Sequence, residues 1–108
     1  MQFFKKIFVF IYVDDLALAS IFIIKNYKSK SPINITSSES FSIKEIANMI
    51  KRIVGFKGKL NYDTSKSDGM LIKTLDNSSI SKLGWKNSYT FSNALKTTYS
   101  WYKNKILP

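Results

Sequence analysis

Short apolar segments alternate with longer amphipathic ones along the chain, which is the pattern of an α/β domain. Residues 7–13, I-F-V-F-I-Y-V, run without polar alternation and are predicted as a buried strand. The segment from Leu16 to about Asn26 is apolar nearly all round, so we expect a helix that is buried on more than one side. Asp14 is placed to cap this helix, and Asp15 to lie at the positive end of its dipole.

Two further strands and one well-marked helix are predicted in the middle of the chain. Ile33–Thr36 alternates its faces and Leu60–Asp63 leads into a polar loop, so both are predicted as short strands. Ser42 and Glu45 have the spacing of a capping box, and the helix after them carries its apolar residues on one face. Gly55 is placed to end that helix, whose apolar face we expect to pack into the core.

Two helical patterns follow in the last third of the chain. Asn77 or Ser78 is placed to cap a short helix that Gly84 closes, with Trp85 folding back on it. The final pattern runs from Thr90 to about Lys105 and carries a broad apolar and aromatic face. We interpret that face as a packing surface rather than as an aromatic binding site.

Polar chemistry is concentrated in one loop, residues 63–76, D-T-S-K-S-D-G-M-L-I-K-T-L-D. Asp68 offers two acceptor oxygens, and Lys66 and Lys73 offer cationic donors. Gly69 lets the backbone approach a ligand closely. These groups suit a phosphorylated, hydroxyl-rich ligand. A solvated turn is the alternative, because D-G is a common turn dipeptide and the chain has sixteen lysines.

Composition narrows the possible partners. The chain has 108 residues, 44% of them hydrophobic, which suits one small domain or part of a larger one. The formal net charge of +10 would suit nucleic acid or an anionic membrane. The lysines are scattered, however, and Arg52 is the one arginine, the residue type best suited to bidentate contacts with bases or phosphates. We therefore expect no nucleic-acid partner.

Cysteine and histidine are both absent from the sequence. Disulfides, thiolate or imidazole metal ligands and nucleophile–histidine pairs are thereby excluded from this chain, and its carboxylates do not have the spacing of a calcium loop. The two Tyr-x-x-x-Lys pairs, Tyr62/Lys66 and Tyr99/Lys103, are uninformative in a chain so rich in tyrosine and lysine. The four glycines form no dinucleotide-binding fingerprint, so we expect the chain to bind no cofactor.

The first twenty residues allow three interpretations. The first interpretation is a signal peptide, because Lys5-Lys6 is followed by the apolar run 7–13 and by a small-x-small pattern at 17–19. Residues 7–24 could instead form one membrane span, but Asp14-Asp15 lie inside it, and each would cost about 2.5–3.5 kcal/mol there. The buried strand followed by a helix is the third interpretation. We adopt it, and expect no membrane partner.

Eight motifs occur along the chain in a characteristic order: F-I-Y-V-D-D-L-A-L-A at 10–19, I-N-I-T-S at 33–37, S-I-K-E-I-A at 42–47, V-G-F-K-G at 54–58, D-T-S-K-S-D-G at 63–69, K-T-L-D at 73–76, L-G-W at 83–85 and T-Y-S-W-Y at 98–102. Together they resemble the carboxy-terminal part of GDP-L-fucose synthase, an extended short-chain dehydrogenase/reductase. The V-D-D motif is shared by many members of that superfamily, whereas the D-T-S-K-S-D-G loop and L-G-W are more particular to the fucose synthases.

The resemblance implies a fold and an activity. The fold class is α/β, a small carboxy-terminal substrate-binding lobe that lacks the Rossmann domain. Residues 10–108 form the lobe, and residues 1–9 are a start that matches poorly, as in a truncation or a reading-frame accident. The family turns GDP-4-keto-6-deoxy-mannose into GDP-L-fucose by epimerisation and reduction with NADPH. Its catalytic and NADP-binding residues lie in the Rossmann domain, so this chain is expected to hold no catalytic, cofactor-binding or metal-binding residue. The family's substrate-binding aspartate and lysine match Asp68 and Lys73.

Three positions depart from the family pattern. Phe8 stands where the family usually has an arginine, so a phosphate contact is missing, and Lys5-Lys6 nearby are not assigned that role. Ile72 replaces another frequent arginine, and Ser67 a frequent proline.

The resemblance also implies partners. We expect a GDP-sugar substrate, a Rossmann-domain half encoded in the same gene or on a separate chain, a homodimeric complete enzyme and a cytoplasmic location. The chain alone is expected to be inactive and to expose an apolar docking surface around Leu16–Ile24. The alternatives are a non-catalytic nucleotide-sugar-binding or interaction module, another nucleotide-sugar epimerase or dehydratase, and a small basic membrane-associated protein.

Overall fold

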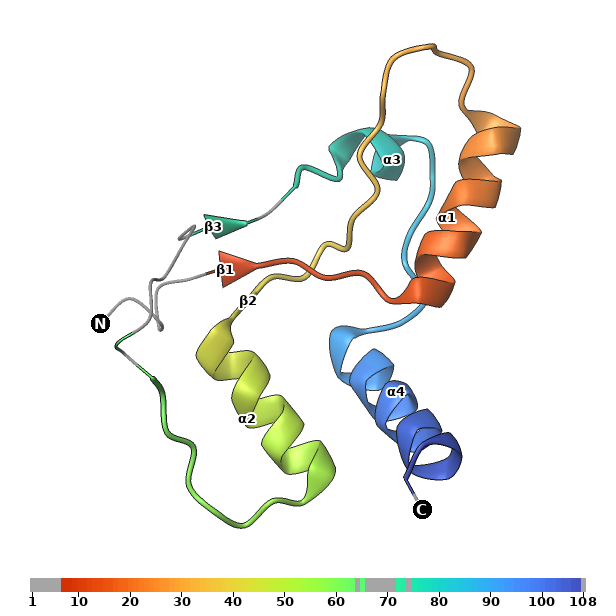
Figure 1. Cartoon of the computed structure of the whole chain (residues 1–108). Coiled ribbons are helices and arrows are strands. Elements are labelled where there is room, and N and C mark those ends of the chain that lie inside the picture. Colours follow the sequence, from red (N-terminus) through yellow and green to blue (C-terminus); the bar gives the residue numbers. More distant parts are fainter. Residues whose placement is uncertain (1–6, 64, 66–71, 74, 108) are drawn as a thin grey trace.

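The computed structural model describes residues 7–63, 65, 72–73 and 75–107. Strands and helices alternate up to α3, as expected for an α/β chain, and a further helix follows (Figure 1). Seven elements are assigned in them: β1 (Ile7–Phe8), α1 (Val13–Asn26), β2 (Phe41–Ser42), α2 (Ile43–Val54), β3 (Ile72–Lys73), α3 (Ser78–Lys82) and α4 (Phe91–Lys105).

The strands form one small sheet in the order β2-β1-β3. The central strand β1 pairs with β2 in antiparallel fashion and with β3 in parallel fashion. The prediction of a strand over residues 7–13 is therefore wrong in length, because β1 ends at Phe8 and Val13 already belongs to α1. β2 and β3 are each assigned over two residues, so within the described part of the chain β1 has no ladder partner beyond Phe8.

The two other predicted strands are absent from the described residues. Ile33–Thr36 and Leu60–Asp63 carry no strand assignment, and β1 pairs instead with Phe41–Ser42 and Ile72–Lys73. An alternating pattern shows that a segment can present two different faces, but it does not identify a hydrogen-bonding neighbour. The two strand predictions were wrong because the neighbour of a strand is fixed by contacts between distant segments.

Helix α1 differs from its prediction at the start and on its surface. It begins three residues before Leu16, and its N-cap residue is Tyr12, which makes no side-chain capping bond, so Asp14 is not the cap. Only Asp15 and Ala19 are buried in it, and Ile24 is 80% exposed. The prediction that α1 is buried on more than one side is therefore wrong for this chain. The predicted exposed apolar surface around Leu16–Ile24 is confirmed.

Helix α2 confirms the predicted terminal signals. The Ser42 hydroxyl accepts a hydrogen bond from the Glu45 amide at 3.1 Å, and the Glu45 carboxylate accepts one from the Ser42 amide at 2.7 Å. Gly55 ends the helix in the left-handed region with φ +77°. The helix lies beside α4 and contacts it (Figure 1). None of its residues is fully buried and Ile50 is 43% exposed, so its apolar face is only partly covered.

We predict that Gly55→Ala lowers the free energy of unfolding by about 1 kcal/mol, because a Cβ strains a residue at positive φ. An added Cβ at Gly55 would meet no atom within 4 Å, so the cost comes from the backbone alone. Thermal unfolding followed by circular dichroism measures the change, with the exposed Lys57→Ala as control. Equal melting temperatures for the two variants would contradict this assignment.

Helix α3 and the residue that follows it make the centre of the core. Ala19 and Ile80 are fully buried and Trp85 is 9% exposed. The Trp85 amide donates to the Ile80 carbonyl at 3.3 Å after a turn at Gly84, where φ is +103°, which confirms that Trp85 folds back on the helix. Partly buried apolar residues surround this core: Ile11, Phe22, Ile23, Ile33 and Ile35.

Helix α4 follows its prediction closely. Thr90 caps it by accepting a hydrogen bond from the Asn93 amide at 3.1 Å. Its first residue, Phe91, packs against Phe41, with ring centroids 4.9 Å apart, whereas Trp101 near its other end is 55% exposed. The predicted packing face is thus used from Phe91 to Tyr99, whereas the last residues of the helix are exposed. The second Tyr-x-x-x-Lys pair is a helix-surface contact, with the Lys103 ammonium 5.1 Å from the centre of the Tyr99 ring.

Membrane-spanning helices are not found in the described part of the chain, where each helix is too short or too polar to cross a bilayer.

Candidate functional site

The predicted substrate-binding residues lie mostly beyond what the structure describes. Asp68, Lys66 and Gly69 are outside the described residues. Lys73 is placed through its backbone, which pairs with Phe8 in the parallel ladder between β1 and β3. The binding role of Asp68 and Lys73 therefore stays a prediction.

The polar segment is fixed at both of its described ends. On the amino-terminal side, the Asp63 carboxylate accepts hydrogen bonds from the amide of Ser65, at 3.0 Å, and from its hydroxyl. These bonds hold the pKa of Asp63 below its ordinary value. On the carboxy-terminal side, Asp76 accepts from the amide and hydroxyl of Ser78, at 2.9 and 3.0 Å. Both ends are local side-chain turns of the kind that aspartate and serine favour.

We predict that Ser78→Ala raises the pKa of Asp76 toward its ordinary value. The Ser78 amide and then its hydroxyl lower that pKa in the folded chain, and the variant removes the hydroxyl only. Because the folded pKa is depressed, the stabilisation is present above the ordinary pKa and is lost as the pH falls through the folded value. Carboxyl carbon chemical shifts followed by NMR between pH 2 and 6 report it, with Asp63 as internal control. An unchanged titration of Asp76 would contradict the assignment.

The best-defined polar cluster in the described residues is built around Asp15. This carboxylate is 1% exposed, and its two oxygens accept hydrogen bonds from the amides of Ser88, at 2.8 Å, and Tyr89, at 3.1 Å. Glu39 accepts from the Phe91 amide at 2.8 Å. Two carboxylates from distant segments thus hold the backbone that leads into α4. A buried carboxylate that accepts charge-assisted bonds is stabilised by them.

Sequence reasoning missed this role of Asp15. It placed the residue at the positive end of the helix dipole, and Asp15 does lie in the first turn of α1. The partners lie 73 and 74 residues away along the chain, so no local pattern names them. The available signal was the sequence V-D-D itself, an acidic pair inside an otherwise apolar run, since a carboxylate is buried only when it finds partners.

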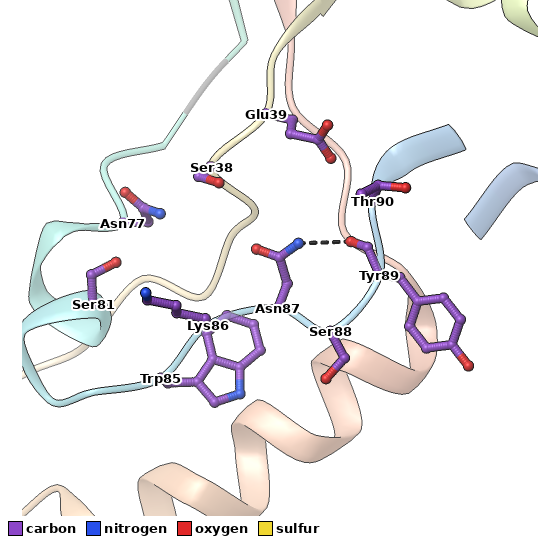
Figure 2. Close-up of a pocket in the computed structure, with 10 residues that line it drawn as sticks. All are labelled: Ser38, Glu39, Asn77, Ser81, Trp85, Lys86, Asn87, Ser88, Tyr89 and Thr90. Atoms are coloured by element: carbon purple, nitrogen blue, oxygen red, sulfur yellow. Dashed lines mark hydrogen bonds between the residues drawn. The ribbon is translucent and has the colours of Figure 1, made fainter. Parts of the chain in front are cut away.

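A pocket of about 440 Å³ opens beside the segment that these carboxylates hold (Figure 2). One wall comes from α3 and its N-cap, a second from the segment before α4, and a third from the segment before β2. Ten residues line it: Ser38, Glu39, Asn77, Ser81, Trp85, Lys86, Asn87, Ser88, Tyr89 and Thr90. The side-chain amide of Asn87 donates a hydrogen bond to the Tyr89 backbone carbonyl at 2.7 Å, which further fixes the second wall.

The pocket lacks one common catalytic arrangement, a nucleophile beside a histidine base. Its serines have no histidine to act as a base, since the chain has none. Among the residues that the structure describes, no three carboxylates come together in a way that could hold a metal ion. The serine and asparagine side chains of the pocket can position a ligand by hydrogen bonds.

The described connection between β1 and α1 differs from the turn of a dinucleotide-binding fold. In a dinucleotide-binding fold this turn is rich in glycine, so that the backbone can approach the pyrophosphate. Here it consists of Val9, Phe10, Ile11 and Tyr12. The two described glycines with positive φ, Gly55 and Gly84, instead follow the carboxyl ends of α2 and α3.

Known proteins that resemble the chain identify its family. No family model matches the chain. It is 41% identical over 98 residues to "Probable GDP-L-fucose synthase 1" of Oryza sativa subsp. japonica, an alignment that covers 91% of this chain and 30% of that relative. The chain is homologous to the carboxy-terminal part of GDP-L-fucose synthases. It spans about 30% of the length of the curated relatives it matches.

Solved structures of GDP-sugar enzymes have the same fold. The GDP-L-fucose synthetase of Naegleria fowleri matches with a TM-score of 0.86 and 34% identity, over 95% of this chain and 32% of that one. The GDP-mannoheptose C4 reductase of Campylobacter jejuni, solved with NADP bound, matches with a TM-score of 0.80 and 38% identity, over 93% and 32%. The expected fold class, a small carboxy-terminal lobe of an extended short-chain dehydrogenase/reductase, is confirmed.

The structure gives the V-D-D motif a physical explanation in this chain. Asp14 is exposed, whereas Asp15 is buried and joins α1 to the segment before α4. The motif therefore supports the architecture of the lobe.

Proposed function

We propose that the chain is the substrate-binding lobe of a GDP-L-fucose synthase-like enzyme. That enzyme would epimerise and reduce GDP-4-keto-6-deoxy-mannose to GDP-L-fucose with NADPH, in the cytoplasm and as a homodimer. The observation that carries the proposal is 41% identity to a GDP-L-fucose synthase over 91% of this chain. A Rossmann half, encoded in the same gene or on a separate chain, would bind NADP and hold the catalytic residues.

Asp68 and Lys73 are the substrate ligands in this proposal. A carboxylate can accept hydrogen bonds from ribose or sugar hydroxyls, and an ammonium can bind a diphosphate. Both residues belong to a segment whose described ends are anchored, by the turn at Asp63 and by the pairing of β3 with β1. Such anchoring reduces the entropy lost when a loop orders around a ligand.

The exposed side of α1 is the docking surface for the Rossmann half in this proposal. Val13, Leu18 and Ile21 are 66, 51 and 51% exposed, an unusual apolar surface for an isolated chain. The relatives are about three times as long as this chain, so their remaining residues could cover such a surface.

The activity of the isolated chain tests the first part of the proposal. We expect no NADPH oxidation, followed at 340 nm, when the purified chain is given GDP-4-keto-6-deoxy-mannose. A stable complex with the Rossmann half of a homologous fucose synthase, with NADPH oxidation restored, would support the division of roles. Turnover by the chain alone would overturn it.

We predict that Lys73→Ala weakens GDP-L-fucose binding at least about tenfold, because a charge-assisted hydrogen bond contributes about 1.5–3 kcal/mol. Asp68→Asn should weaken it as well, since the amide replaces one acceptor oxygen by a donor. Isothermal titration calorimetry measures both, with the exposed Lys57→Ala as matched control. If all three variants bind like the original chain, Asp68 and Lys73 are not the ligands.

A non-catalytic nucleotide-sugar-binding or interaction module is the second candidate. The two residues proposed as substrate ligands, Asp68 and Lys73, both lie in this chain, so such a module would need no second domain to bind its ligand. Such a module would bind GDP-L-fucose equally well with and without a Rossmann half. For an enzyme lobe, affinity should rise when the Rossmann half is present.

A further inference from the structure

The pocket beside α3 is not explained by the proposed function. It is formed entirely by described residues, and it contains neither Asp68 nor Lys73. Its volume of about 440 Å³ lies in the range of small-ligand sites, which is about 300–1,000 Å³. The pocket is therefore large enough for a ligand of a single ring.

The charges of the lining favour a neutral ligand. Lys86 is the one cation among the ten lining residues and Glu39 the one anion, so their formal charges cancel. One oxygen of Glu39 already accepts from the Phe91 amide, which keeps this carboxylate at the pocket wall. A phosphate would meet Glu39 as well as Lys86, and like charges that face each other are unfavourable.

The uncharged lining groups match hydroxyls. Ser38, Ser81 and Asn77 each offer both a donor and an acceptor, which is the pairing that a sugar hydroxyl requires. The Asn77 side chain makes no capping bond to α3, although this residue is the N-cap. In Figure 2, Asn77 and Ser81 extend from the α3 side, and Ser38 and Asn87 lie across from them.

The walls are held rigid before any ligand binds. Trp85 is 9% exposed and packs in the core with Ile80 and Ala19, so it offers a fixed aromatic surface. Asp15 holds the amides of Ser88 and Tyr89 behind the pocket. Binding to preorganised walls avoids most of the cost of ordering side chains and loops.

We propose that this pocket binds one neutral sugar ring, with Asn77, Ser38 and Ser81 contacting its hydroxyls and Trp85 lining the pocket beside it. The ring could come from a free saccharide or from the glycosyl part of a nucleotide sugar. The site does not depend on the function proposed for Asp68 and Lys73. For a ligand of this size in an open pocket, we expect a dissociation constant of about 1–10 mM.

The two tryptophans of the chain make a direct test possible. Trp85 lines the pocket, whereas Trp101 is 55% exposed on α4 and serves as internal control. The ¹⁵N-labelled full chain is titrated separately with L-fucose, D-mannose, GDP and GDP-mannose, and both indole N–H signals are followed by NMR. The signal of Trp85 should shift with saturation while that of Trp101 stays in place.

The four ligands separate the sources of the ring. Shifts of Trp85 with the free sugars support a saccharide site, and shifts with GDP-mannose but not with free mannose support a glycosyl site supplied by a nucleotide. A shift of Trp85 with GDP equal to that with GDP-mannose would overturn the assignment to a sugar. No shift of Trp85 with any of the four would overturn the site itself.

A matched pair of variants then tests the contacts. Asn77→Ala removes an amide from the pocket, and Asn93→Ala removes the same group from the exposed side of α4. We expect the dissociation constant for the shifting ligand to rise at least about fivefold in Asn77→Ala and to stay unchanged in Asn93→Ala, as for loss of one neutral hydrogen bond. Unchanged indole positions without ligand show that each variant is folded. Equal affinities of the two variants would contradict the proposed contacts.

Discussion

Replacing Asp15 with alanine is expected to lower the free energy of unfolding by about 3–6 kcal/mol, because two hydrogen bonds to a charged group are lost and each contributes about 1.5–3 kcal/mol. The carboxylate is 1% exposed and accepts from two backbone amides, those of Ser88 and Tyr89. Small domains have only about 5–15 kcal/mol in total, so the variant should be marginally folded. Urea unfolding followed by circular dichroism measures the change.

The neighbouring Asp14 supplies a matched control. It carries the same charge in the same first turn of α1 but is exposed, so Asp14→Ala should cost only the dipole contribution of about 0.3–1 kcal/mol. If Asp15→Ala does not fold, Asp15→Asn replaces it, because asparagine keeps one acceptor oxygen. Its loss of unfolding free energy should lie between those expected for Asp14→Ala and Asp15→Ala. Similar losses for Asp14→Ala and Asp15→Asn would show that the two amides find other partners.

The helices could be predicted from the sequence because their signals are local. Ser42 and Glu45 cap α2 by contacts within three residues, and Gly55 ends it through its own φ angle. Thr90 caps α4 in the same way. Each signal involves neighbours that are close whatever the rest of the chain does.

The strands could not be predicted in the same way. Ile33–Thr36 has an alternating pattern and no ladder partner, while Phe41–Ser42 pairs with β1 without any such pattern. Pairing depends on which segments the helices bring together. A two-residue strand is also too short for periodicity to be read from it.

The candidate pocket could not be anticipated either, for a related reason. Its residues come from segments around 38, 77–81 and 85–90, and no spacing rule joins them. The polar loop 63–76 could be identified from the sequence because its polar residues are contiguous there. The pocket is contiguous only in space, where Asp15 and Glu39 hold one of its walls.

The apolar character of α1 shows how a correct pattern led to a wrong conclusion about burial. A helix that is apolar nearly all round is normally covered on several sides. In this chain Leu16, Leu18 and Ile21 remain 40, 51 and 51% exposed. The curated relatives of this chain are about three times as long, which agrees with an apolar surface selected in a larger protein.

Ile80→Ala is expected to destabilise the chain by about 2–5 kcal/mol, since removing a fully buried isoleucine loses transfer free energy and leaves a cavity. Ile80 is 0% exposed and packs with Ala19 and Trp85, which join α1 to the segment after α3. The better helix propensity of alanine offsets only about 0.4 kcal/mol of this. The same urea unfolding measurement applies.

Ile24→Ala is the control of the same chemistry, because Ile24 is 80% exposed on α1. It should change the free energy of unfolding by less than about 0.5 kcal/mol, as surface substitutions generally do. The contrast separates the two groups of apolar residues: those around Ile80 hold this chain together, whereas those around Ile24 are available to a partner. If Ile24→Ala lowers the free energy of unfolding as much as Ile80→Ala, the outer face of α1 is buried in solution, either by self-association or by other residues of this chain. The docking surface proposed for the Rossmann half would then have to be abandoned.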